Sequence, residues 1–227
     1  VLIDTGLGDK QSEKFFSFVQ PHGEDSLESS LHKLGVDYND ITDVVMTHLH
    51  FDHCGGAVTR NSNGDLRPTF KNATYWSAED QWEWAVNPNQ RERASFLKEN
   101  FIPLQESGQL KFAKDGEEIF PDFKVKQVYG HTEGMLIPHI TRNGKTLVFM
   151  ADLLPSTAHV GAAYVMGYDV RPLTTMQEKN DFFTDAVEKD YALFFEHDKD
   201  NECCNIKSEN GKFKANEIFS LKDWMGS

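Results

Sequence analysis

The chain contains few cysteines and no long apolar segment. Only three of its 227 residues are cysteines, Cys54, Cys203 and Cys204, and the last two are adjacent. An odd count with this spacing does not indicate a disulfide framework, and it favours a reducing compartment such as the cytoplasm. No apolar run approaches the roughly 18 residues that a membrane-spanning helix needs. We therefore expect no membrane-spanning helix in this sequence.

Basic residues are also scarce relative to acidic ones. Lysine and arginine together number 23 against 36 aspartates and glutamates, which gives a formal net charge of −13. The phosphates of nucleic acid and the surface of an anionic membrane would both be repelled by this charge. A metal site within such a chain can still be positive locally. The charge thus predicts neither nucleic acid nor membrane as a partner.

The hydrophobic content is sufficient for one large domain. Of the residues, 39% are hydrophobic and 12% are aromatic, and we find no repeat or linker that would divide the chain. We predict a single domain over residues 1–227. The chain opens on Val1-Leu2-Ile3-Asp4, which reads as a strand running directly into a turn. This abrupt start predicts that residues upstream are missing, so the localisation is open apart from a preference for the cytoplasm.

Apolar strands and amphipathic helices alternate along the chain, which indicates an α/β fold. The hydrophobic spacing predicts helices over 26–34, 77–86, 90–100 and 175–188. It predicts strands over 1–3, 43–46, 74–76, 123–129, 135–140, 146–150 and 192–195. Asn143-Gly144 lies between two of these strands and predicts a hairpin, because both residues tolerate positive φ.

Histidine and aspartate side chains follow the ends of several predicted strands. Imidazole nitrogens and carboxylate oxygens are ligands that zinc prefers, whereas burying so many of them in an apolar core would be costly. The sequence therefore predicts a metal site at one sheet edge, where rigid strands hold the ligand loops. The candidate ligands are His48, His50, Asp52, His53, His131, Asp152 and His197.

The order of these residues resembles one known superfamily. His48-Leu49-His50-Phe51-Asp52-His53, followed by Gly55-Gly56, is similar to the HxHxDH signature of the metallo-β-lactamase-fold hydrolases. Four further segments resemble the other motifs of that superfamily: Leu2-Ile3-Asp4-Thr5-Gly6, Gly130-His131-Thr132, Ala151-Asp152 and Glu196-His197-Asp198. The resemblance implies an α/β fold of the four-layer αββα type, in which two mixed sheets are covered by helices. Members usually have further strands before the first motif, so the resemblance also implies that N-terminal strands are missing here.

The resemblance also implies two divalent metal ions, with zinc as the first choice. His48, His50 and His131 would bind one ion, Asp52, His53 and His197 would bind the other, and Asp152 would bridge the pair. Asp4 would support the ligand loop without binding the metal itself, or would simply cap a tight turn. Cys54 is expected to be a small packed residue rather than a sulfur ligand.

The implied activity is hydrolysis of a lactone or ester by a hydroxide that bridges the metals, with Asp52 and Asp152 taking part through the metals and Asp152 relaying a proton. Phe51 with Gly55-Gly56 is closest to the quorum-quenching lactonases and organophosphate hydrolases, so an acyl-homoserine-lactone type of substrate is the leading interpretation. A phosphotriesterase or β-lactamase-like hydrolase is the alternative. An iron-dependent persulfide or redox enzyme of the same fold is the alternative from another class.

The group that would stabilise the oxyanion is open. Many acyl-homoserine lactonases carry a tyrosine three residues beyond the bridging aspartate, where this chain has Pro155. Tyr164 and Tyr168 are candidates for a catalytic hydrogen bond, or else aromatic residues satisfied elsewhere, and His159 lies where it could reach substrate.

Aromatic side chains could line a pocket for an acyl chain, or could equally belong to the core. They are Phe15, Phe16, Phe18, Trp82 and Trp84. The expected partner is a small molecule, neutral and partly apolar, and a homodimer is left open.

Overall fold

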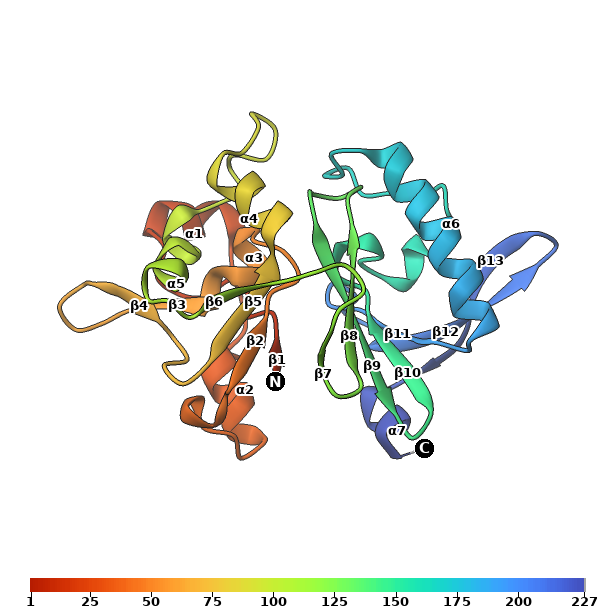
Figure 1. Ribbon diagram of the computed structural model, residues 1–227, viewed down its shortest axis with the longest axis horizontal. Helices are drawn as coiled ribbons and strands as arrows, with labels where there is room; N and C mark the ends of the chain where they lie inside the picture. Colours follow the sequence, from red (N-terminus) through yellow and green to blue (C-terminus); the bar gives the residue numbers. More distant parts are fainter. Residues whose placement is uncertain (227) are drawn as a thin grey trace. The chain divides into compact units, whose positions relative to one another are not determined.

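The structure, a computed structural model, describes residues 1–226. Its backbone divides into two compact units, Val1–Phe112 and a second unit that begins at Ala113 (Figure 1). Each unit contains its own sheet with helices beside it. The single domain expected over residues 1–227 stays a prediction. Among residues 1–226, no helix combines the length and the apolar character that crossing a membrane requires.

A four-stranded sheet organises the first unit, with the strand order β1-β2-β5-β6. These strands are β1 (Leu2–Ile3), β2 (Asp43–Val45), β5 (Thr74–Ala78) and β6 (Leu110–Ala113). β2 runs parallel to both β1 and β5, and its apolar residues are fully buried, as expected for a parallel strand covered on both faces. β3 (Val58–Arg60) and β4 (Leu66–Pro68) form a separate antiparallel pair.

The helices of the first unit are short. They are α1 (Glu13–Val19), α2 (Leu27–Lys33), α3 (Phe51–Cys54), α4 (Glu79–Val86) and α5 (Ile102–Glu106), with 3₁₀ turns at η1 (Tyr38–Asp40), η2 (Gly55–Ala57) and η3 (Lys98–Asn100). The predicted start of α2 is confirmed, because Ser26 is its N-cap and exchanges hydrogen bonds with Ser29 in a capping box. Gly35 follows the helix with a φ of 71°, which glycine adopts without steric cost.

Two local predictions in this unit are wrong. Residues 90–95 form turns rather than a helix, and only Lys98–Asn100 becomes helical, as a 3₁₀ turn. The side chain of Asn89 accepts hydrogen bonds from the backbone of Arg91 and Glu92, and this local bonding competes with a helix. The helix predicted over 77–86 begins at Glu79 instead, because β5 continues to Ala78, which is the N-cap and makes no side-chain bond there.

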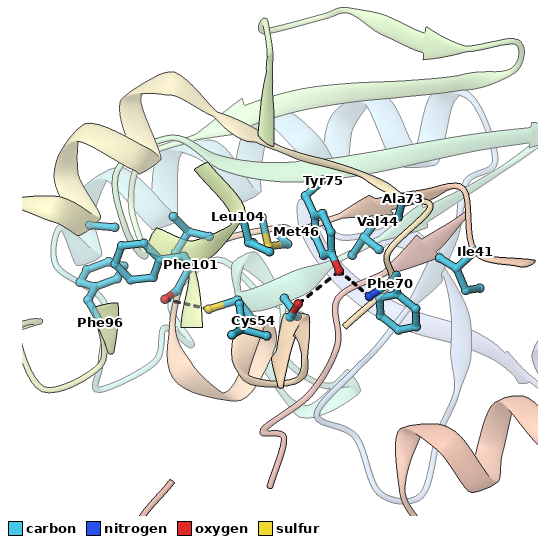
Figure 2. Close-up of a cluster of buried hydrophobic side chains, with 14 of the residues drawn as sticks. Ile41, Val44, Met46, Cys54, Phe70, Ala73, Tyr75, Phe96, Phe101 and Leu104 are labelled. Carbon is cyan, nitrogen blue, oxygen red and sulfur yellow. Dashed lines mark hydrogen bonds between the residues drawn. The ribbon is translucent and has the colours of Figure 1, made fainter. Parts of the chain in front are cut away.

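The core of the first unit lies against the sheet and includes the cysteine beside the ligand motif (Figure 2). The hydroxyl of Tyr75, a fully buried residue, accepts a hydrogen bond from the backbone N–H of Phe70 at 2.9 Å and donates one to the carbonyl of Ala57 at 3.2 Å. Cys54 donates its thiol to the carbonyl of Leu49 at 3.3 Å, and burial raises the pKa of that thiol to about 12. Cys54 is therefore a packed, protonated core residue, as expected.

A seven-stranded sheet organises the second unit, with the order β13-β12-β11-β10-β9-β8-β7. Its strands are β7 (Glu118–Phe120), β8 (Phe123–Val128), β9 (Met135–Arg142), β10 (Lys145–Phe149), β11 (Ala192–Phe194), β12 (Cys203–Glu209) and β13 (Lys212–Phe219). The long helix α6 (Pro172–Glu188) packs against β12, and α7 (Leu221–Gly226) follows β13 (Figure 1). The predicted hairpin is confirmed, with φ of 52° at Asn143 and 76° at Gly144.

The strand directions of the second unit bring three loops to one edge of its sheet. β10 and β11 are parallel, so the segments after Phe149 and Phe194 emerge at the same edge. β8 is antiparallel to β9, which is antiparallel to β10, so β8 ends at that edge as well. These segments carry His131, Asp152 and His197, and the 3₁₀ turns η4 (Ala151–Leu153) and η5 (Thr157–His159) lie in the loop after β10.

Candidate metal site

The first unit carries four candidate ligands directly after β2. Because β1 and β2 are parallel, Asp4 at the end of β1 lies beside the ligand loop at the end of β2. Asp4 Oδ1 accepts from the backbone N–H of Thr47 at 2.7 Å, and Oδ2 accepts from the Thr47 hydroxyl at 2.7 Å. Asp4 Oδ2 also lies 3.0 Å from Nδ1 of His53. Asp4 therefore supports the ligand loop and orients a candidate ligand, so it does more than cap a turn.

The imidazole rings of this loop are close together. The ring centroids of His48 and His50 lie 4.5 Å apart, and those of His48 and His53 lie 4.0 Å apart. Asp52 Oδ2 lies 3.8 Å from His53 Nε2. All four candidate ligands of the first unit are thus gathered at one place, at the start of α3.

Each of these rings also faces a second polar group on one side. His48 Nδ1 lies 3.0 Å from the Thr47 hydroxyl, and His50 Nε2 lies 3.5 Å from Glu92 Oε1. Glu92 is buried and accepts from the indole N–H of Trp84 at 2.7 Å. Metal-binding histidines generally use one ring nitrogen for the metal and direct the other to such an orienting group. The surroundings of these rings therefore match those of metal ligands.

Glycine is required where the end of the ligand helix meets the first loop. A Cβ added to Gly56 would overlap the carbonyl oxygen of Thr5, and one added to Gly55 would overlap the carbonyl of Leu7. The Thr5 backbone N–H in turn donates to the carbonyl of His53 at 2.7 Å. The two glycines of the motif thus permit the close packing that holds α3 against the first loop.

Asp152 connects the other two candidate histidines within the second unit. Its Oδ2 lies 3.1 Å from His131 Nε2, and its Oδ1 lies 3.1 Å from His197 Nε2. The preceding residue, Ala151, is fully buried and has a φ of 44°, a left-handed conformation that an alanine adopts only when its surroundings enforce it. The backbone is therefore strained at the point that aims the Asp152 carboxylate between the two histidines.

Sequence reasoning missed two acidic residues that hold His131. Asp169 is buried, and its Oδ1 lies 3.0 Å from His131 Nδ1. Glu178 on α6 accepts from the backbone N–H groups of Tyr129 at 2.6 Å and Gly130 at 3.0 Å. Asp169 precedes α6 and Glu178 looks like an ordinary helix charge, so nothing in the local sequence marks either as a support for the His131 segment.

The loop after Asp152 carries Tyr164 and Tyr168, the two tyrosines that we predicted from the sequence to be catalytic candidates. The residue exposures are 65% for Tyr164 and 77% for Tyr168, so neither ring is part of the core. The backbone carbonyl of Tyr164 accepts from the ammonium group of Lys179 at 2.5 Å. A catalytic role for either hydroxyl stays a prediction.

The proposed aromatic pocket residues have mixed surroundings. Trp82 packs edge-to-face on Phe101 of the first core, with 5.6 Å between ring centroids. Phe15 packs in the same manner on Phe51 of the ligand motif, at 5.2 Å. Phe18 is 76% exposed. Trp82 is therefore partly buried and packed against the core, while Phe15 lies against the start of α3.

The donor set fits a divalent metal. The first unit gathers three imidazoles and a carboxylate, and the second gathers two imidazoles on a single carboxylate. Nitrogen and carboxylate oxygen donors with carboxylate-supported rings are the combination in which zinc sites are usually found. The combination of all seven residues into one centre stays a prediction.

Comparison with known proteins gives the family. The sequence profile of the metallo-beta-lactamase superfamily matches residues 1–182. The structure of a probable metal-dependent hydrolase from Staphylococcus aureus superposes with a TM-score of 0.86 at 27% identity, covering 97% of this chain and 77% of that one. The chain belongs to the metallo-β-lactamase superfamily. The α/β fold class predicted from the sequence is thereby confirmed.

One further relative and one further solved structure of this fold are described as lactonases. N-acyl homoserine lactonase AiiA of Bacillus thuringiensis subsp. kurstaki is 25% identical over 144 residues, which are 59% of this chain and 50% of that protein. The structure of AidC, a dizinc quorum-quenching lactonase with a bound product, superposes with a TM-score of 0.77 at 20% identity, covering 96% of this chain and 75% of the other. The chain spans about half the length of the curated relatives that it matches.

Proposed function

We propose that this protein is a metal-dependent hydrolase with a dinuclear, zinc-preferring centre that opens a lactone or cleaves a similar neutral ester. One ion would be held by His48, His50 and His131 and the other by Asp52, His53 and His197, with Asp152 shared. The substrate class that we favour is the acyl-homoserine lactones.

One observation carries this proposal: the two oxygens of Asp152 face different histidines. Oδ2 lies 3.1 Å from a nitrogen of His131, and Oδ1 lies 3.1 Å from a nitrogen of His197. In the assignment above these histidines belong to different metal ions, so a carboxylate shared between them is suited to bridging. A structural zinc site, by contrast, is normally closed by four ligands around one ion.

The bound ions would supply a water nucleophile activated at neutral pH and a Lewis acid for the carbonyl oxygen. Asp52 and Asp152 contribute two negative charges against the four positive charges of two divalent ions. The site would therefore keep a net positive charge, which suits the negative charge that develops on a carbonyl oxygen under attack. Asp152 would also pass a proton to the departing alkoxide.

The relatives support the same class of reaction without fixing the substrate. The names of AiiA and AidC describe acyl-homoserine-lactone or quorum-quenching lactonases, and AidC is described as dizinc. A neutral lactone is also compatible with the formal charge of −13, which would repel an anionic substrate.

The test is a substrate panel on protein of known metal content. Hexanoyl-homoserine lactone, a phosphotriester and a β-lactam would be assayed after zinc loading, with metal measured by mass spectrometry. We expect two zinc ions per chain and turnover of the lactone above the other two. A single iron per chain would contradict the proposal and favour a redox enzyme of this fold, and preferred turnover of the phosphotriester would contradict the lactonase assignment.

Two variants connect the activity to the site. His50→Ala and Asp152→Ala should each abolish lactone hydrolysis and lower the bound metal, while circular dichroism shows a folded protein. The matched controls are His32→Ala and Asp181→Ala, since both residues are exposed and lie outside the candidate ligands. Equal turnover in His50→Ala and His32→Ala would refute the proposed centre.

A further inference from the structure

A buried lysine fixes the loop that follows Asp152. Lys179 lies on α6 with 1% exposure, and its ammonium group donates to three backbone carbonyls of one loop. The acceptors are His159 at 2.9 Å, Gly161 at 2.9 Å and Tyr164 at 2.5 Å. A buried ammonium group is costly unless its hydrogen bonds are satisfied, so these three bonds constrain the loop strongly.

The beginning of the same loop is tied to the segment of His197. Thr157 donates its backbone N–H and its hydroxyl to Asp198 Oδ2, at 2.9 and 2.7 Å. Asp198 directly follows His197, so the 3₁₀ turn Thr157–His159 is anchored next to one candidate ligand. Asp152, a second candidate ligand, precedes the loop in the chain. The loop is therefore held close to the edge of the seven-stranded sheet where Asp152 and His197 lie.

His159 projects from this anchored turn. Its Nδ1 lies 2.8 Å from the hydroxyl of Ser156, and the residue is partly exposed. No other hydrogen bond to this ring is present within residues 1–226. The ring is thus oriented on one side by Ser156, with Nε2 on the opposite side.

The charges around His159 favour the neutral ring. Partial burial and the ammonium group of Lys179 lower the pKa of His159, while the carboxylates of Asp169 and Asp152 oppose this shift. If the Ser156 hydroxyl donates to Nδ1, the proton of the neutral ring is on Nε2.

We propose that His159 is a further catalytic residue, whose Nε2–H donates a hydrogen bond to the substrate carbonyl oxygen as negative charge develops on it. This inference rests on the proposed hydrolase function. In this arrangement the Ser156 hydroxyl donates to Nδ1, which leaves the ring proton on Nε2, and Lys179 holds the turn in position. A neutral donor of this kind stabilises an oxyanion without transferring a proton, and it is most effective when it is fixed before the reaction.

The first test measures kinetics with hexanoyl-homoserine lactone on zinc-loaded protein. Removing one oxyanion donor typically lowers kcat by about 100-fold or more, and we expect this of His159→Ala, with KM changed only a few-fold. His159→Gln should recover most of the loss because its amide N–H can replace Nε2–H. Ser156→Ala should lower kcat less than His159→Ala, because it frees the tautomer but leaves the ring. His32→Ala is the control, and zinc content should be unchanged in all of these variants.

The second test reads the tautomer without relying on activity. Nitrogen-15 correlation spectra at pH 7.5, with the signal assigned by its absence in His159→Gln, should show a neutral ring protonated on Nε2. In Ser156→Ala the Nε2–H population should fall. An Nδ1–H tautomer or a charged ring in the parent protein would overturn the proposal.

The outcomes separate this inference from the function on which it rests. Absence of turnover on every member of the substrate panel, with two zinc ions bound, would overturn both. If the lactone is turned over, His50→Ala is inactive and His159→Ala keeps its kcat, the hydrolase stands and the role of His159 is refuted. A loss of kcat in Tyr164→Phe or Tyr168→Phe, with His159→Ala unaffected, would transfer the oxyanion role to the tyrosine.

Discussion

Asp169 Oδ1 lies 3.0 Å from Nδ1 of His131, although 38 residues separate the two in the chain. Both side chains are buried. The backbone supports the same pairing, because the N–H of Val170 donates to the carbonyl of His131 at 3.2 Å. A carboxylate in this position fixes the ring and makes its other nitrogen a better metal donor.

Asp169→Asn should therefore weaken metal binding while leaving the fold intact. The loss of an orienting carboxylate typically costs about 10- to 100-fold in metal affinity. Competition with a chromogenic chelator measures this affinity directly. Asp181→Asn on the exposed side of α6 is the control, and equal affinity in the two variants would contradict a supporting role for Asp169.

Asp4→Ala should destabilise the folded protein. The change leaves the buried backbone N–H and hydroxyl of Thr47 without the carboxylate that accepts from them at 2.7 Å each. An unsatisfied buried donor costs about 1–3 kcal/mol, so we expect a loss of at least about 2 kcal/mol in the free energy of unfolding. Urea denaturation monitored by tryptophan fluorescence provides the measurement. Asp9→Ala, at an exposed position of the same loop, should leave the urea midpoint unchanged.

The ligand motif could be predicted from the sequence because strand ends and ligands are encoded locally. Val44 and Val45 predict a buried strand, and the histidines follow it directly. The roles of Asp169 as a partner of His131, and of Glu178 as a partner of the backbone just before it, could not be predicted. Their role depends on where α6 packs, and a helix charge usually faces solvent.

The helix predicted over residues 90–100 is absent because contacts of particular side chains outweigh the local preference. Its composition suits a helix, but Asn89 bonds to the following backbone and Glu92 is buried beside His50. Local bonding by Asn89 and the tertiary contact of Glu92 together override a helix propensity that is worth less than about 1 kcal/mol per residue. The structure thus departs from the local prediction at a residue that contacts a candidate ligand.

His139 should make the protein less stable in acid. Burial lowers the pKa of His139 from 6.5 to about 4, and its Nδ1 lies 2.9 Å from the carbonyl of Ile137, which suits an N–H donor. Between these two pH values the unfolded chain binds a proton that the folded chain does not. The contribution of His139 to the free energy of unfolding is therefore fully present above pH 6.5. It is lost as the pH drops from about 6.5 to about 4.

His139→Gln tests this linkage, since glutamine cannot take up the proton. Urea denaturation from pH 4 to pH 8 should show a shallower loss of stability in acid for the variant than for the parent. His22→Gln, at an exposed site, should retain the parent's dependence. Identical acid slopes in the His139→Gln variant and the parent would show that His139 does not contribute.

Lys179→Met should loosen the loop that carries His159 and Tyr164. The methionine keeps a similar length but removes three hydrogen bonds to backbone carbonyls. Bonds to a charged donor are worth about 1.5–3 kcal/mol each, so local opening should become at least about tenfold more frequent. Hydrogen exchange read by mass spectrometry should show faster exchange in peptides covering residues 156–166. Lys189→Met, an exposed lysine just beyond the same helix, is the matched control, and equal exchange in the two variants would show that the loop is held by other contacts.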